Sequence, residues 1–183
     1  MRVFIAIEFS DEIKTYLKHV QQVIELGCTR GKPTRHDNFH ITLKYIGQVS
    51  DSQIDDLTDL VDEVADKVDP FTIKLGDIGT FKSRNKNIIW QGITSGKKQL
   101  QSLYDLIENQ VENYGLEKED RRFKPHVTLI KEAVFNESCV LESVPLFTED
   151  ILVEKISLML SARENDILKY TPIYQRQLHK KRK

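Results

Sequence analysis

The sequence has only two cysteines among its 183 residues, Cys28 and Cys139, and they form no C-x-x-C pair. Their spacing fits neither a metal site nor a redox motif, so we interpret both as unpaired thiols in a reducing compartment. No apolar stretch approaches the roughly 20 residues that a membrane helix needs. The apolar run within MRVFIAIEFSDEIK is too short for a secretory signal. We therefore expect a cytoplasmic protein without a membrane segment.

An excess of charge is also missing, because 27 basic residues are matched by 28 acidic ones, for a net charge of -1. Proteins that bind long nucleic acids without sequence preference usually carry a strong positive excess. Any contact with nucleic acid is therefore expected only at an end or at a single phosphate group. The hydrophobic share of 39% and the charged share of 30% are typical of a globular protein. We expect one domain over residues 1–183 with a disordered basic tail at 179–183, acting as a monomer without an obligate protein partner.

Several familiar catalytic motifs are absent from the sequence as well. It has no G-x-S-x-G elbow of a serine hydrolase. It has neither the H-x-H nor the H-E-x-x-H spacing of a zinc site, and no phosphate-binding G-x-x-x-x-G-K-[ST] loop. We therefore expect an activity that uses no metal and no cofactor.

The hydrophobic pattern predicts an α+β fold. Ser10 is a helix cap, followed by apolar residues at helical spacing to Ile24. Further helices are expected at about 51–68 and 97–113, the latter ended by Gly115. Strands are expected at 2–9, 39–47, 71–81, 87–93, 123–131, 151–162 and 167–178. Because several strands follow one another without an intervening helix, mostly antiparallel sheets fit better than a doubly wound parallel sheet.

The clearest motif occurs twice: HITL begins at His40, and HVTL begins at His126, 86 residues later. Each copy follows a predicted strand and helix, which indicates a faint internal repeat. We therefore expect a bilobal protein with two mostly antiparallel sheets, flanking helices and a pseudo-twofold axis. Since strand side chains alternate between faces, the histidine and threonine of each copy share one face, and the two polar faces can meet across a cleft between the lobes.

Two imidazoles on opposite sides of one phosphorus atom suit an in-line displacement. One neutral histidine can take a proton from water, while the other, protonated, gives a proton to the leaving oxygen. Threonine hydroxyls can donate hydrogen bonds to the oxyanion that develops in the transition state. The constellation therefore predicts hydrolysis of a phosphodiester. A single strand histidine is more often structural, and only its repetition in the same context favours catalysis.

These motifs resemble those of the two-histidine phosphoesterase superfamily, in particular the RNA 2′,3′-cyclic phosphodiesterases long labelled 2′-5′ RNA ligases. The resemblance covers nearly the whole chain. It is carried by RVFIAIEFSDEI, NFHITLKYIG, RRFKPHVTLIK and SLMLSARENDILKYTPIYQRQL.

The resemblance implies that His40 and His126 are the acid–base pair and that Thr42 and Thr128 bind the substrate phosphate. The implied reaction opens the 2′,3′-cyclic phosphate at an RNA 3′ end and leaves a 2′-phosphate. It gives His126 the role of the base and His40 that of the acid. The reverse reaction would join RNA ends through a 2′-5′ bond.

Lys131 stands where the family usually has arginine and is a candidate for binding the substrate phosphate. Strict alternation puts it on the opposite face from His126, so that it either reaches the substrate through a bulge in the strand or has a different role. Arg122 and Lys124 could attract an RNA end, or they could be solvated charges. Phe39 and Phe123 could stack a terminal base, or they could pack beside the strands.

Two further aromatic residues, Tyr45 and Trp90, are expected in the core. One alternative function is that of a 2′-5′ oligonucleotide or nucleotide cyclic phosphodiesterase. Another, of a different class, is that of a non-catalytic module that binds RNA ends.

Overall fold

The computed structural model describes residues 1–84, 86–136, 144 and 146–179. Its three α-helices lie where the sequence predicts them: α1 (Asp11–Glu25), α2 (Ser52–Ala65) and α3 (Lys97–Gln110). The Ser10 hydroxyl accepts a hydrogen bond from the Ile13 amide and so caps α1 as expected. α3 continues into the 3-10 turn η2 (Val111–Tyr114), after which Gly115 ends the turn in the left-handed conformation. A second 3-10 turn is η1 (His36–Asn38).

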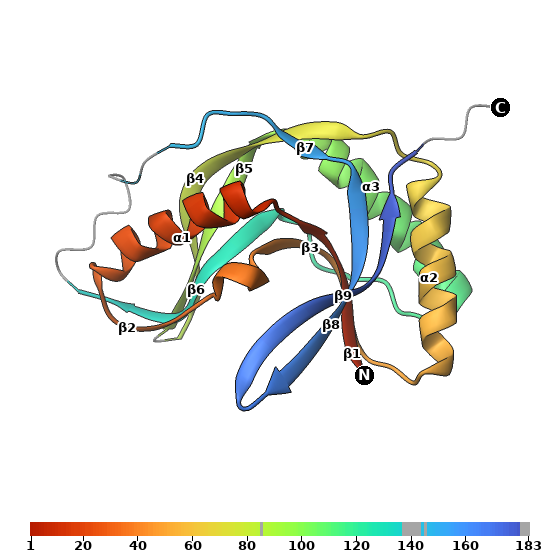
Figure 1. The fold of residues 1–183 in the computed structure, drawn as a ribbon, viewed down its shortest axis with the longest axis horizontal. Helices are drawn as coiled ribbons and strands as arrows, with labels where there is room; N and C mark the ends of the chain where they lie inside the picture. Colours follow the sequence, from red (N-terminus) through yellow and green to blue (C-terminus); the bar gives the residue numbers. More distant parts are fainter. Residues whose placement is uncertain (85, 137–143, 145, 180–183) are drawn as a thin grey trace.

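The strands form one curved sheet, and every pairing between the described strands is antiparallel. Figure 1 shows α1 beside one end of the sheet, with α2 and α3 near the other. The strands are β1 (Arg2–Glu8), β2 (Cys28–Pro33), β3 (His40–Gln48), β4 (Phe71–Ser83), β5 (Lys86–Ser95), β6 (His126–Phe135), β7 (Ile151–Val153), β8 (Lys155–Glu164) and β9 (Ile167–Gln177).

The α+β class and the antiparallel strands are confirmed, but the two expected sheets are joined into one. The strand order is β7-β4-β5-β6-β3-β1-β8-β9, and β2 pairs with β6 outside this order. The join between β6 and β3 is narrow, because these strands pair only at Ile41 and Val127. Each half of the sheet therefore brings one copy of the repeated motif to this join.

Two strands differ from the sequence prediction. No strand was expected over Cys28–Pro33, a segment that contains Gly31 and Pro33, yet it forms β2 and pairs with β6 along an exposed edge. The expected strand 151–162 is divided into β7, which pairs with β4, and β8, which pairs with β1 and β9. The end of the basic tail, residues 180–183, lies outside the described residues, as does Cys139.

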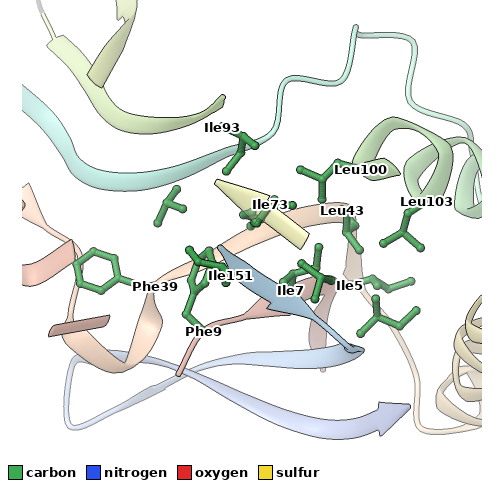
Figure 2. Close-up of a cluster of buried hydrophobic side chains, with 14 of the residues drawn as sticks. Ile5, Ile7, Phe9, Phe39, Leu43, Ile73, Ile93, Leu100, Leu103 and Ile151 are labelled. Carbon is green, nitrogen blue, oxygen red and sulfur yellow. The ribbon is translucent and has the colours of Figure 1, made fainter. Parts of the chain in front are cut away.

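One hydrophobic core spans the join between the two halves. Figure 2 shows residues of β1 and β3, such as Ile5 and Leu43, beside Ile73 of β4 and Leu100 of α3. Burial of apolar surface on both sides of the join holds the two motif strands together. None of the helices in the described part of the chain is long and apolar enough to cross a membrane.

Candidate active site

The two motif strands place their polar side chains on one face of the sheet. In β3 and in β6 the residues between and after the polar pair are fully buried or nearly so, while His40, Thr42, His126 and Thr128 are not. The Ile41–Val127 pair lies between the two motifs. An antiparallel register on either side of this pair brings His40 next to Thr128, and Thr42 next to His126. The predicted alternation and convergence of the two motifs therefore agree with the geometry.

Both imidazoles are held in the same orientation. Nδ1 of His40 lies 2.7 Å from the Asn38 carbonyl oxygen, and Nδ1 of His126 lies 2.6 Å from the Lys124 carbonyl oxygen. Since a carbonyl oxygen only accepts, each Nδ1 carries a hydrogen, and in the neutral ring Nε2 is the acceptor. Nε2 of His40 accepts a hydrogen bond from the Thr42 hydroxyl at 2.8 Å. The backbone carbonyls of the two motifs therefore hold both neutral histidines in the same tautomer, with the hydrogen on Nδ1.

Aromatic rings pack around both histidines. The ring centroids lie at 4.9 Å (Phe4) and 5.2 Å (Tyr170) from His40, and at 5.0 Å (Phe81) and 6.1 Å (Trp90) from His126. This packing removes water from the imidazoles and so disfavours their charged forms.

The pKa of His40 is lowered to about 4, mainly by burial and also by the charges of Lys131 and His126, against opposing effects of the Asn38 carbonyl and Glu8. Burial also lowers the pKa of His126, with a contribution from the Lys124 charge and against the hydrogen bond to the Lys124 carbonyl. Both histidines are therefore neutral in the ligand-free protein at pH 7.

The lowered pKa of His40 predicts a loss of stability in acid. In the unfolded chain this imidazole titrates near 6.5, and in the folded protein near 4. Because the unfolded state then binds a proton that the folded state does not, the free energy of unfolding falls as the pH drops from about 6.5 toward 4, and this loss is absent above that window. Urea unfolding of wild type and His40→Gln at pH 7 and pH 5 checks this. Equal losses in the two proteins between these pH values would contradict it.

Both histidines line a cleft with two arms, His40 in one arm and His126 in the other. The His40 arm has a volume of about 710 Å³ and includes Thr128 in its lining. The His126 arm has a volume of about 1110 Å³. Thr42 and Tyr45 line both arms, so the arms meet at the centre of the site.

Tyr45 was predicted in the core, but its ring lies in the cleft and 61% of the residue is exposed. The reason is a bulge in β3: Lys44 pairs with Ile5 and Thr42 with Ala6, so that Leu43 has no opposite residue. After this extra residue the alternation is inverted, and Tyr45 falls on the same face as Thr42.

The same irregularity places Lys131 in the cleft. In β6, Ile130 pairs with Ile89 and Thr128 with Trp90, so that Leu129 is the extra residue. Lys131 therefore leaves the face that strict alternation predicts and lines the His40 arm together with Thr128. The bulges occupy equivalent positions in the two motifs, so the internal repeat extends to them.

The other predicted binding residues are divided between core and cleft. Phe39 is only 1% exposed and lies in the core, so of its two expected roles the structure supports packing and not stacking on a base. Phe123 lines the His126 arm and stacks on Tyr104, with ring centroids 4.3 Å apart. Arg122 and Lys124 line the same arm.

Trp90 was predicted in the core but is half-buried and lines the His126 arm. A side chain on Gly79 of the neighbouring strand would be impossible there, since its Cβ would lie 2.2 Å from Cη2 of the indole. Glycine therefore lets the indole occupy the sheet surface. The Lys124 ammonium sits 4.3 Å from the centroid of the Trp90 ring, a cation–π contact that holds this charge beside His126.

Sequence reasoning gave no role to Tyr170, which packs on His40 and lines the same arm. The signal in the sequence was the closing segment SLMLSARENDILKYTPIYQRQL, which contains Tyr170 and carries part of the resemblance to the family. This hairpin turns at Asn165 and Asp166, both at positive φ as their residue types allow. Within the described ranges, no three His, Cys, Asp or Glu side chains are grouped to hold a metal ion.

Comparison with known proteins gives the family. The family model of the 2′-5′ RNA ligase superfamily matches residues 9–164. The RNA 2′,3′-cyclic phosphodiesterase of Escherichia coli K12 is 28% identical over 173 residues, covering 94% of this chain and 93% of the relative. The protein of the same name from Bacillus subtilis 168 is 30% identical over 139 residues, covering 73% and 76%.

A solved structure supports the same conclusion. Escherichia coli LigT complexed with 3′-AMP superposes with a TM-score of 0.79 at 25% identity and covers 97% of each chain. The match to the family model extends over most of the chain and contains both histidine motifs. The chain therefore belongs to the 2′-5′ RNA ligase superfamily.

Proposed function

We propose that this protein hydrolyses the 2′,3′-cyclic phosphate at RNA 3′ ends to a 2′-phosphate, with His40 and His126 as the acid–base pair. The observation that best supports this proposal is the matched pair of imidazoles, each oriented through Nδ1 by a backbone carbonyl two residues upstream. The names of the relatives support the substrate. The two-histidine arrangement needs no metal for either proton transfer.

In the proposed reaction His126 Nε2 takes a proton from water, whose oxygen forms the new bond to phosphorus. The bond between phosphorus and the 3′ oxygen breaks, and His40 Nε2 donates its proton to that oxygen. The products are a 2′-phosphate and a 3′-hydroxyl, and proton exchange with solvent restores both imidazoles.

This division of roles requires His40 to gain a proton when substrate binds, because its pKa in the ligand-free protein is about 4. A phosphate anion beside the ring favours the charged imidazolium and so raises that pKa. Thr42, Thr128 and Lys131 line the same arm and can donate hydrogen bonds to the non-bridging oxygens. The ammonium of Lys131 is a single point charge, without the planar fork of the usual arginine.

The cleft suits an RNA terminus. Charged side chains that can meet the backbone phosphates, such as Arg35 and Arg163, line the His40 arm, while aromatic rings line the His126 arm. With a net charge of -1, such local cations fit an end better than a duplex. We further propose a monomer that acts in the cytoplasm, on the basis of the composition and the cysteine content.

A second candidate function is 2′-5′ ligation at the same site. The cavity of the His126 arm, about 1110 Å³, is much larger than a water nucleophile requires. A nucleoside could occupy it and present its 5′-hydroxyl to His126. In water, hydrolysis would dominate.

The decisive assay uses a short RNA that ends in a 2′,3′-cyclic phosphate, incubated with the protein in EDTA. We expect turnover that EDTA does not change, with a 2′-phosphate product identified against synthetic 2′- and 3′-phosphate standards. A cyclic mononucleotide run in parallel tests the alternative substrate class. Binding without turnover at any pH would contradict the proposal and favour the RNA-end-binding module.

A further inference from the structure

Lys131 reaches the cleft only because β6 is bulged after Thr128. Leu129 and Ile130 are both fully buried, so two consecutive side chains point into the core. The next side chain, that of Lys131, is then exposed and lines the His40 arm. Loss of the bulge would restore strict alternation and turn Lys131 away from the site.

A buried glutamine of α1 holds the carbonyl at this bulge. Gln21 is 0% exposed. Its Nε2 donates hydrogen bonds to the carbonyl oxygens of Leu129 at 2.7 Å and Thr34 at 2.8 Å. The Thr34 amide donates to the same Leu129 oxygen at 2.8 Å. The Leu129 carbonyl is thus fixed by one donor from a helix and one from the chain just after β2.

The strands on both sides of β6 fix the other end of the bulge. Glu132, the residue after Lys131, has a φ of 54°, a left-handed conformation that is uncommon for this residue type. Its carboxylate bridges Lys32 of β2 at 2.7 Å and Lys86 of β5 at 2.9 Å. The irregular backbone is therefore held from three directions, as is typical of strain retained at a functional site.

We propose that Gln21 is a positioning residue that fixes the β6 bulge and thereby directs the Lys131 ammonium into the His40 arm. Gln21 lies behind the sheet and acts through Lys131. The part of the inference that concerns phosphate binding rests on the proposed function, while the part that concerns the position of Lys131 does not.

The imidazole of His40 reports the position of Lys131 without any substrate. The charged groups that act on it are Lys131 and His126 of β6, which lower its pKa, and Glu8 of β1, which raises it. The rings that pack on it, Phe4 and Tyr170, include no group charged at neutral pH. Withdrawal of Lys131 from the arm would therefore raise the pKa of His40.

The test compares Gln21→Met with Gln91→Met. Gln91 is a matched control, because it is 1% exposed and its Nε2 donates to the Tyr16 hydroxyl and to the Gly76 carbonyl, neither of which belongs to the bulge. We expect both variants to have a lower Tm. In an NMR titration without substrate, only Gln21→Met raises the pKa of His40. With the cyclic-phosphate RNA, only Gln21→Met raises KM, by roughly tenfold, the scale of one lost hydrogen bond to a charged group.

A double-mutant cycle with Lys131→Met separates positioning from a general structural effect. If Gln21 acts through Lys131, then Gln21→Met changes neither the His40 titration nor KM further in the Lys131→Met background. Additive effects would overturn the inference. It would also be overturned if Gln21→Met lowered the Tm but changed neither the pKa of His40 nor KM.

Glu132→Val provides an independent variant in case Gln21→Met does not fold. It removes both ion pairs and puts a β-branched residue at a positive φ, where such residues are strained, so it disfavours the same bulge. We expect the His40 titration to move in the same direction. An unchanged His40 titration in this variant would overturn the inference. If the protein did not act on this RNA, the pKa of His40 would still shift in these variants. Failure of the proposed function can therefore be distinguished from failure of the positioning role.

Discussion

Replacement of either cleft histidine by alanine is expected to lower kcat on the cyclic-phosphate RNA by roughly 10²- to 10⁴-fold, the usual contribution of a general acid or base. Each imidazole is held through Nδ1 by a carbonyl, which leaves Nε2 for the proposed proton transfer, so His40→Ala and His126→Ala remove a proton carrier that water cannot replace in position. Steady-state kinetics with circular dichroism as a check on folding measures the effect.

His36→Ala is the matched control for both variants. His36 lies four residues before the first motif histidine, but its ring contacts Asp37 and Thr15, and it does not line the arms of the cleft. We expect this variant to keep the wild-type rate. Full activity in either His40→Ala or His126→Ala would contradict the assignment of the acid–base pair.

A substrate with a good leaving group distinguishes the acid from the base. The 2′-(4-nitrophenyl phosphate) of a 3′-deoxynucleoside releases a nitrophenolate, which needs no proton from an acid. We expect His40→Ala to regain most of its activity on this ester, and His126→Ala to remain impaired, because the attacking water still needs a base. The opposite pattern would make His40 the base, in line with its lowered pKa in the ligand-free protein.

The repeated motif was sufficient to predict the polar face of the two motif strands, because strand alternation is a local property. It correctly placed His40 and Thr42 on one face and predicted that His126 and Thr128 would meet them. It could not predict which face the next residues take. A bulge depends on partners far away in the sequence: Gln21 and Leu129 are separated by 108 residues. Tyr45 was therefore misplaced by the same rule that placed the histidines, and strict alternation without a bulge would have misplaced Lys131 as well.

Long-range packing also decides the remaining positions, which the sequence alone placed wrongly or left open. Trp90 has the sequence context of a core residue, and only the glycine on the neighbouring strand leaves room for its ring beside the cleft. Phe39 sits next to the first motif, yet it is buried because its side chain packs into the shared core. The exposed strand β2 contains glycine and proline, so its pairing with β6 comes from that neighbour rather than from its own propensity.

Lys44 lies at the bulge of β3, at the position that corresponds to Ile130 in β6, and its charged side chain is buried. The side chain of Lys44 is 6% exposed and that of Glu108 of α3 is 10% exposed, with Nζ 2.9 Å from Oε1. The Lys44 ammonium also donates to the Glu117 carbonyl at 2.7 Å, and the Glu119 amide donates to the Glu108 carboxylate at 2.9 Å. This ion pair therefore connects α3, β3 and the segment that leads to Arg122, Phe123 and Lys124.

Removal of one partner of this pair is expected to have a large effect on stability. Lys44→Met leaves the Glu108 carboxylate buried without its cation, and we expect the free energy of unfolding to fall by about 3–5 kcal/mol. The double variant Lys44→Met/Glu108→Gln removes both charges and keeps an oxygen for the Glu119 amide, so most of the loss should be recovered. Urea unfolding at pH 7 measures both.

Lys118→Met is the control, because Lys118 pairs with Glu112 at a similar distance, 2.8 Å, but both side chains are exposed. An exposed pair contributes at most about 1 kcal/mol. If Lys44→Met loses much more stability than Lys118→Met, the burial of the pair, and not the presence of an ion pair, explains the difference. Equal losses in Lys44→Met and Lys118→Met would contradict this, since they would mean that water reaches the Glu108 carboxylate once its partner is gone.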